Sequence, residues 1–185
     1  MSWESSTIEY IKTDLALQGF IPSAIFIILC YAVFLNARAA PWGLALLVFP
    51  GTVAHELAHL AMGLILGARP RNVSLWPQRT AQGWRLGEVG FRRIGILNGA
   101  FVSLAPIVLF PLGWLCFIHV MVPAWLMRQW LVWSVVGYLA ATLFYASIPS
   151  LTDLRAGARS LIVYSTLGIA LWAVAPMLHG WFSGG

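Results

Sequence analysis

The chain has 185 residues, a length that fits one domain, and its composition excludes an ordinary soluble protein. Hydrophobic residues make up 60% of it and charged residues only 9%, against about 25% charged residues in typical globular chains. The net charge of +5 does not indicate a nucleic-acid partner, because the basic residues lie in short loops between apolar runs. We therefore predict a single membrane-embedded domain over residues 1–185, in contact with the lipid bilayer.

Residues 1–18 are predicted to form a short amphipathic helix at the membrane interface. Ser6 and Glu9 make a capping box, and apolar residues recur after them at helical spacing. A cleaved signal peptide is the alternative, because Ala37-Arg38-Ala39 resembles a cleavage site. However, acidic residues outnumber Lys12 in this stretch, whereas a signal peptide begins with a positive segment. We expect the helix to lead into a first span that is retained.

Apolar segments long enough to cross a bilayer then follow one another along the chain. A spanning helix needs about 17–25 residues, and prolines inside such helices are tolerated. The pattern predicts an all-α, multi-pass membrane protein with about five transmembrane helices. The five segments run from Phe20 to Ala37, Trp42 to Leu66 (with Pro50 inside), Ile94 to Val122, Trp130 to Ile148 and Leu161 to Leu178.

The second segment carries the motif His55-Glu56-Leu57-Ala58-His59. Residues four apart share one face of a helix, so His55 and His59 can bind one zinc ion, and Glu56 is close enough to act as general base on a metal-bound water. Ionisable residues at membrane depth are costly, which makes them functional by default. Two hydrogen-bonded structural histidines are the alternative, but the segment has no Lys or Arg to pair with Glu56.

A basic hairpin or re-entrant loop is predicted for residues 69–93, directly after the motif segment. Val73-Ser74-Leu75-Trp76 is a candidate strand, and a second extended run goes from Gly83 to Phe91. Glycines and prolines in this stretch disfavour a helix. A solvated basic loop at the membrane surface is the alternative.

A third metal ligand must come from elsewhere, because a catalytic zinc usually takes three protein ligands and keeps one position for water. His119 and His179 lie near the outer ends of the third and fifth segments, far from the depth of the motif. We expect them to anchor these segments at the membrane interface. Asp153 remains among the carboxylates. It follows Pro149, which should end the fourth helix and turn the chain back toward the bundle. A helix N-cap, or a pair with Arg155, is the alternative role for Asp153.

The basic residues also predict an orientation. With five spans, the N-terminus and the loops after the second and fourth spans share one side, and the positive-inside rule makes that side cytoplasmic and places the C-terminus outside. A compact multi-pass chain of this kind suits a prokaryotic plasma membrane. Arg38 and Arg128 lie on the outer side, and the inner side holds nine of the eleven basic residues: Lys12, Arg69, Arg71, Arg79, Arg85, Arg92, Arg93, Arg155 and Arg159.

An HExxH motif in a membrane span, with a Pro-containing turn and an Asp after a later span, resembles the site-2 protease family of intramembrane zinc metalloproteases. The resemblance covers roughly Pro50 to Asp153, and the chain would be a small member without a PDZ domain. It implies that His55, His59 and Asp153 bind one Zn²⁺ and that Glu56 activates the attacking water. The family's usual second motif differs, because Leu154-Arg155 follows Asp153 here where the family has Gly.

The resemblance further implies how a substrate would be held. The substrate would be a membrane protein with a transmembrane helix, and the hairpin would offer it a strand edge. Asn98 is a candidate for the substrate-clamping amide that the family's second motif supplies, with an interhelical hydrogen bond as the alternative. The candidate substrate-binding residues on the hairpin are Gly87, Glu88, Val89, Gly90 and Phe91.

The function predicted from these patterns is hydrolysis of a peptide bond in or near a substrate's transmembrane segment. A metal transporter is one alternative, but it does not explain a Glu placed beside His55. A di-iron lipid oxidase needs more than the four histidines present. A catalytically inactive, zinc-binding scaffold for a partner protein is equally compatible with an intact motif. The sequence predicts neither a particular substrate nor an oligomeric state.

Overall fold

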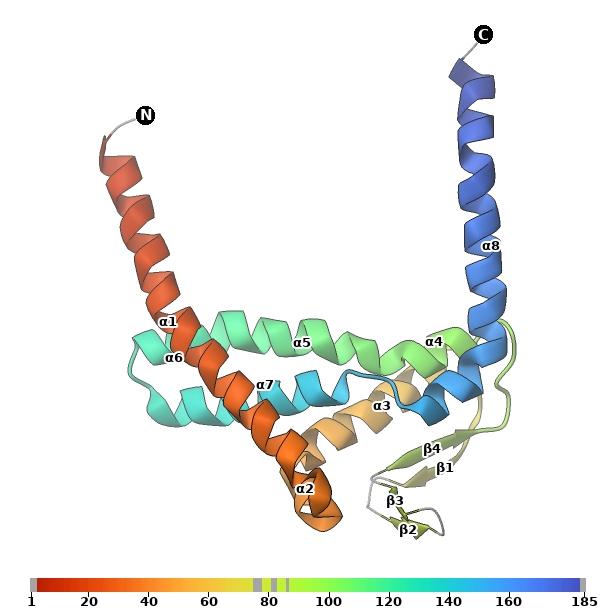
Figure 1. Cartoon of the computed structure of the whole chain (residues 1–185), viewed down its shortest axis with the longest axis horizontal. Coiled ribbons are helices and arrows are strands. Elements are labelled where there is room, and N and C mark those ends of the chain that lie inside the picture. The colour runs from red at the N-terminus through yellow and green to blue at the C-terminus, as the bar shows by residue number, and fades with distance from the viewer. Residues whose placement is uncertain (1–2, 75–77, 81–82, 86, 184–185) are drawn as a thin grey trace.

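The computed structural model describes residues 3–74, 78–80, 83–85 and 87–183, and the side chains within them at 17–38, 40, 42–74, 87 and 89–176. The described chain is mostly helical (Figure 1). Short 3₁₀ turns at Ala37–Ala39 and Ala105–Val108 and a π turn at Phe117–Met121 join some helices. The α-helices are α1 (Trp3–Asn36), α2 (Pro41–Leu47), α3 (Phe49–Ile65), α4 (Gly99–Leu104), α5 (Leu109–Cys116), α6 (Val122–Leu126), α7 (Trp130–Ala146) and α8 (Leu151–Ser183).

Within the described residues, three stretches of helix are long and apolar enough to cross a membrane. They cover Leu17–Asn36 in α1, Gly99–Leu126 from α4 through α6, and Leu151–Pro176 in α8. Helix α7 is also apolar but has 17 residues. Many large apolar side chains on these helices are exposed, which suits a protein whose solvent is lipid. The helices therefore suggest a membrane protein, whereas the predicted count of five spans is not confirmed.

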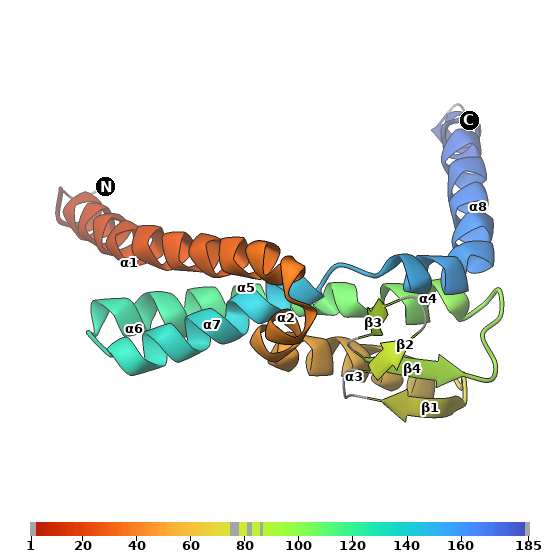
Figure 2. The same ribbon diagram turned by 60° about the horizontal axis from the view of Figure 1, so that its bottom comes forward.

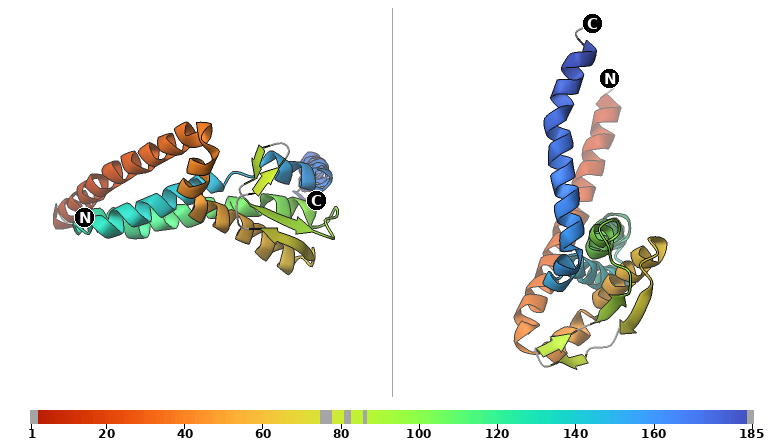
Figure 3. Two further views of the ribbon diagram at one scale, coloured as in Figure 1. Left: turned by 90° about the horizontal axis from the view of Figure 1, so that it is seen from below. Right: turned by 90° about the vertical axis from the view of Figure 1, so that its right-hand side faces the viewer.

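The arrangement of the helices departs from a bundle of parallel spans. Helices α4 to α6 and α7 lie alongside each other, α1 crosses them at an angle, and most of α8 rises steeply away from them (Figures 1 and 2). The two termini consequently extend toward the same side of the molecule (Figure 3). The side chains of the outer part of α8 that are described are largely exposed.

Helix boundaries correct the sequence prediction at three places. Helix α1 is continuous, without a break between the predicted interfacial helix and the first span, and it holds Pro22 in its interior. The second predicted span is two helices, because α2 ends at Leu47 and α3 begins at Phe49 with Pro50 in its first turn. Proline lacks an amide hydrogen and is favoured where a helix starts. Helix α8 begins at Leu151, ten residues before the predicted fifth segment.

The basic segment after α3 is confirmed as a β-hairpin. Strand β1 (Pro70–Ser74) pairs antiparallel with β4 (Glu88–Phe91), and β2 (Gln78–Thr80) pairs with β3 (Gly83–Arg85). The candidate strand that begins at Val73 continues into residues 75–77, outside the described residues. Gly67 and Arg69 have positive φ values of 65° and 53°, which turn the chain sharply from α3 into β1.

Small residues allow close packing around α3, the helix with the motif. A Cβ added at Gly51 would overlap Thr142 of α7, and one added at Gly63 would overlap the ring of Phe91 in β4. At Gly99 of α4, an added Cβ would lie 3.1 Å from the Cβ of Ser160 in α8. Backbones can approach this closely only where a side chain is missing or small. The packing brings α3, the C-terminal end of α7, the start of α8 and the hairpin together around the motif.

Candidate metal centre

The two motif histidines lie on one face of α3 and are held by backbone carbonyls. The Nδ1 atom of His55 lies 2.6 Å from the carbonyl oxygen of Ala146, and Nδ1 of His59 lies 2.7 Å from that of Val102. A carbonyl only accepts a hydrogen bond, so each Nδ1 carries the proton and donates it. The Nε2 atoms face each other at 3.1 Å, and each can bind a metal ion when it carries no proton. Metal-binding histidines usually donate their other ring N–H in this way, which fixes the tautomer and the orientation of the ring.

Asp153 brings its carboxylate to the same two nitrogens. Its Oδ2 lies 3.4 Å from Nε2 of His55, and its Oδ1 lies 3.3 Å from Nε2 of His59. Each of the three residues offers one ligand atom, and these three atoms lie within 4.8 Å of one another. Tetrahedral ligands about 2.0–2.1 Å from a zinc ion stand roughly 3.3 Å apart, so these spacings fit a shared metal ion. The chemistry of the donors, two imidazoles and a carboxylate, fits zinc as well.

The carboxylate of Asp153 is also fixed by its own helix. Its Oδ2 accepts a hydrogen bond from the backbone N–H of Ser150 at 2.7 Å, and Oγ of Ser150 accepts one from the N–H of Asp153 at 3.2 Å. This reciprocal pair is a capping box at the start of α8. The sequence left two roles open for Asp153, a helix cap and a metal ligand. In the structure, the same carboxylate caps α8 and lies against both histidines. Among the described residues, the carboxylate of Asp153 lies against the two histidines and forms no ion pair with Arg155.

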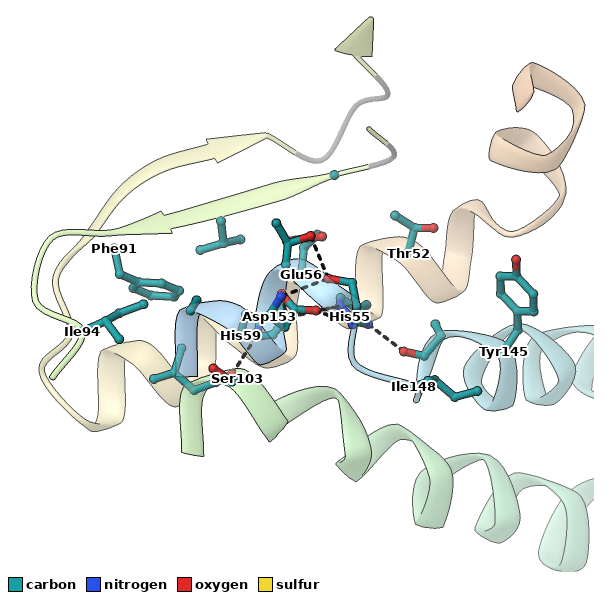
Figure 4. A pocket seen from close by; sticks show the side chains of 17 residues that line it. Thr52, His55, Glu56, His59, Phe91, Ile94, Ser103, Tyr145, Ile148 and Asp153 are labelled. Atoms are coloured by element: carbon teal, nitrogen blue, oxygen red, sulfur yellow. Dashed lines mark hydrogen bonds and ion pairs between the residues drawn. The ribbon is translucent and has the colours of Figure 1, made fainter. Parts of the chain in front are cut away.

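Glu56 lies beside these three residues and is 8% exposed. The chain just before β4 covers it, because a Cβ added at Gly87 would lie 2.7 Å from Cγ and 3.0 Å from Oε1 of Glu56. Figure 4 shows the hairpin passing over the cluster formed by Glu56, His55, His59 and Asp153. A side chain at residue 87 would therefore displace the side chain of Glu56.

A cavity of about 480 Å³ surrounds the cluster. In Figure 4 its wall extends to both sides of the histidines, with Phe91, Ile94 and Ser103 on one side and Thr52, Tyr145 and Ile148 on the other. The first side is mainly apolar, and the second offers the hydroxyl groups of Thr52 and Tyr145. An extended peptide lying along the hairpin would pass from one side to the other across the ligands.

The structure places only some of the predicted substrate-binding residues at the cavity. Gly87, Val89 and Phe91 line the cavity, whereas Gly90 lies against Asn72 of the neighbouring strand. The side chain of Glu88 lies outside those described.

Asn98 is not brought to the cavity. Its Oδ1 accepts a hydrogen bond from the N–H of Gly95 at 2.8 Å, and its Nδ2 donates one to the carbonyl of Arg93 at 2.9 Å. The amide thus closes the turn before α4 and bonds neither a second helix nor the site. His119 lies in the π turn between α5 and α6 and is not part of the cluster, and the side chain of His179 lies outside those described.

Several residues of the site are not evident from the sequence. The carbonyls of Ala146 and Val102 have no signature, because every residue carries a carbonyl. Thr52 and Tyr145 reach the cavity only through the packing of α3 against α7. A signal did exist for Ser150, because a Ser three residues before an Asp at a helix start is a capping-box pattern.

Comparisons of the chain with protein-family models, with curated proteins and with solved structures each found no match. What can be inferred about function therefore comes from the chain's own residues.

Proposed function

We propose that the chain is an intramembrane zinc metalloprotease, similar to the site-2 protease family, that hydrolyses a peptide bond in or near a substrate's transmembrane segment. The observation that supports this most is the convergence of His55, His59 and Asp153 on one point, with Glu56 in the same cavity. Three ligands with an adjacent carboxylate are the set that a zinc hydrolase requires.

The roles of the residues follow from their chemistry. His55, His59 and Asp153 would hold the ion, and Zn²⁺ bound there would supply a water of lowered pKa and polarise the substrate carbonyl. Glu56 accepts the proton of the attacking water and passes it to the leaving amine nitrogen. The Ala146 and Val102 carbonyls keep both imidazoles in the tautomer that presents Nε2.

The hairpin is proposed to hold the substrate. A transmembrane helix satisfies its own backbone hydrogen bonds, so the segment to be cleaved must unwind and find new partners. Among the described strands, β4 pairs only with β1, and it contributes Val89 and Phe91 to the cavity wall. Its other edge can pair with an extended segment of substrate and lay it across the ligands.

The distribution of basic residues supports a finer proposal for topology. We infer five crossings, with the N-terminus in the cytoplasm and the C-terminus outside, in the plasma membrane of a prokaryote. Helices α3 and α7 would add two crossings to the three long ones. Each has 17 residues, which at 1.5 Å per residue reach about 26 Å, close to the roughly 30 Å of a hydrocarbon core.

Glu56→Gln tests the proposed reaction. The variant should bind zinc stoichiometrically, because Glu56 is not a ligand, and should cleave model transmembrane peptides at least about a hundredfold more slowly, since it lacks the base. Metal analysis of the purified protein and peptide cleavage in liposomes are the measurements. Equal cleavage by Glu56→Gln would overturn the proposal. Stoichiometric zinc with no cleavage by the unmodified protein would instead favour a zinc-binding scaffold.

A further inference from the structure

We propose that a groove between α1, α5 and α7 is a binding site for one anionic phospholipid, with an acyl chain in the groove and the phosphate on Arg38. The residues that line the groove are different from those that line the metal-centre cavity, although Tyr145, which contacts Arg38, belongs to that cavity. The inference does not rest on proteolytic activity. It rests on the shape and lining of the groove, on the position of Arg38 at one end of it, and on the charge that Arg38 leaves unmatched.

The groove is apolar throughout and has a volume of about 430 Å³. Helix α1 forms one wall, and aromatic rings of α5 and α7 form the other. A wall of this kind has no hydrogen-bond partner to offer a polar ligand, but it suits a hydrocarbon chain. The residues that line it are Ile27, Ile28, Tyr31, Ala32 and Leu35 of α1, Phe110 and Trp114 of α5, and Phe144 of α7.

Arg38 continues the face of α1 that lines the groove. Ile27, Tyr31 and Leu35 are spaced four apart, and Arg38 follows three residues later, so the four residues share one side. Arg38 lies just beyond α1, in the turn at Ala37–Ala39, and its side chain is exposed. Arg38 is not itself a lining residue, but this spacing places its cation just past Leu35, the last residue of α1 that lines the groove.

The side chain of Arg38 is held by Tyr145, against which Tyr31 packs. Its Nε donates to the hydroxyl of Tyr145 at 3.4 Å, and its guanidinium carbon lies 5.7 Å from the centre of the Tyr145 ring. The Tyr145 ring in turn meets the edge of Tyr31, a groove residue, with 5.6 Å between ring centres. The hydrogen bond to Tyr145 raises the pKa of Arg38, and the guanidinium is charged in any case.

The charge of Arg38 points to an anionic partner. Among the residues that the structure describes, no carboxylate forms an ion pair with Arg38. Guanidinium groups bind phosphate well, through several N–H donors in one plane. A ligand that combines a hydrocarbon chain with a phosphate, and that is available at a membrane surface, is a phospholipid. A net negative lipid is favoured over a zwitterionic one, whose ammonium group offsets the phosphate charge.

The test is native mass spectrometry of the full-length protein in detergent, after delipidation and addition of either phosphatidylglycerol or phosphatidylcholine. The unmodified protein should retain one phosphatidylglycerol in preference to phosphatidylcholine. Arg38→Gln should reduce that retention about fivefold, which corresponds to the roughly 1 kcal/mol of one basic residue at a lipid surface. Arg38→Lys should restore most of it, because the charge returns.

Two further variants separate the parts of the proposal. Arg128→Gln is the matched control, because Arg128 is also exposed but lies between α6 and α7, at the end of α7 opposite Tyr145. This variant should bind like the unmodified protein. Ala32→Phe should fill the groove and reduce retention of both lipids. Equal retention by Arg38→Gln, an equal loss in Arg128→Gln, or no preference between the two lipids would each overturn the proposal. Helix content from circular dichroism confirms that every variant is folded.

Discussion

At the scale of single residues, the site depends on protonation states that the backbone imposes. Both Nδ1 atoms donate to carbonyls, which turns both Nε2 atoms toward each other, 3.1 Å apart, and toward the carboxylate of Asp153. Two neutral imidazoles in this position repel each other unless a proton or a cation lies between them. In the proposed site, a metal ion would fill that place and contact all three residues at once.

Replacing either motif histidine should therefore remove the metal. We expect His55→Ala and His59→Ala to fall from one zinc per chain to nearly none, because two remaining ligands bind zinc weakly. His119→Ala is the control, since His119 lies away from the cluster, and it should keep its zinc. Metal analysis by mass spectrometry decides the question. Zinc that survives in His59→Ala would place the ion elsewhere.

Ser150 should influence metal affinity without touching the metal. Ser150→Ala removes the oxygen that accepts a hydrogen bond from the N–H of Asp153, so the carboxylate loses part of its support. Removing a group that supports a metal ligand typically lowers metal affinity about 10–100-fold. We expect a loss of about tenfold for Ser150→Ala, because the backbone N–H of Ser150 still donates to the carboxylate. Competition with a zinc chelator measures the change. Ser134→Ala, which removes a hydroxyl bonded only within α7, should bind zinc as the unmodified protein does.

At the scale of elements, the hairpin and α3 act as one unit through Gly87. The backbone before β4 lies directly on Glu56, and a side chain at residue 87 would push the Glu56 carboxylate aside. The same hairpin lines the cavity with Val89 and Phe91. Its position therefore determines both where Glu56 points and where a substrate strand would lie.

Gly87→Ala should lower activity while leaving the metal in place. Its methyl group would press on Cγ and Oε1 of Glu56 and displace the carboxylate, whereas the three ligands are untouched. We expect cleavage to fall about tenfold or more, since a misplaced general base forfeits much of its contribution. Gly95→Ala is the control, because nothing lies within 4 Å of a Cβ at that position. Equal activities of the two variants would show that Gly87 does not position Glu56.

Much of the site could be predicted from the sequence because its chemistry is local. The four-residue spacing of His55 and His59 places both on one helix face in any fold, and few carboxylates remained to compete with Asp153. The hairpin followed from glycines and prolines, whose backbone limits are also local. The carbonyls of Ala146 and Val102, the turn-closing role of Asn98 and the cover of Glu56 by Gly87 depend on how distant segments pack, and no single-residue signal marks them.

The boundaries of the helices were predicted less well for a related reason. Apolar composition shows that a stretch can lie in lipid, but not where its backbone bends. Pro50 was compatible with an uninterrupted span and instead begins a new helix at Phe49, while the capping box of Ser150 and Asp153 starts α8 well before its apolar run. Polar and proline positions decide such ends, and hydropathy alone does not.

At the scale of the whole molecule, the question is how the helices lie in a membrane. Three helical stretches have the length of a span, yet α8 rises steeply from the layer of α5 and α7 (Figure 1). Reporter fusions can test the proposed topology. Fusions at Arg38 and Arg128 should report the outer side, and a fusion at Arg79 the cytoplasm. A cytoplasmic signal from Arg128 would reduce the number of crossings and overturn the five-span proposal.

The double use of the Asp153 carboxylate has a consequence for how the protein assembles. The group that would complete the metal site is also the group that starts α8, so the free energy of metal binding and that of forming the first turn of α8 are thermodynamically linked. Loading the ion should protect the amides of that turn from hydrogen exchange, and chelation should release them. The state of the metal would thereby affect α8, whose described outer side chains are largely exposed and extend away from the cavity.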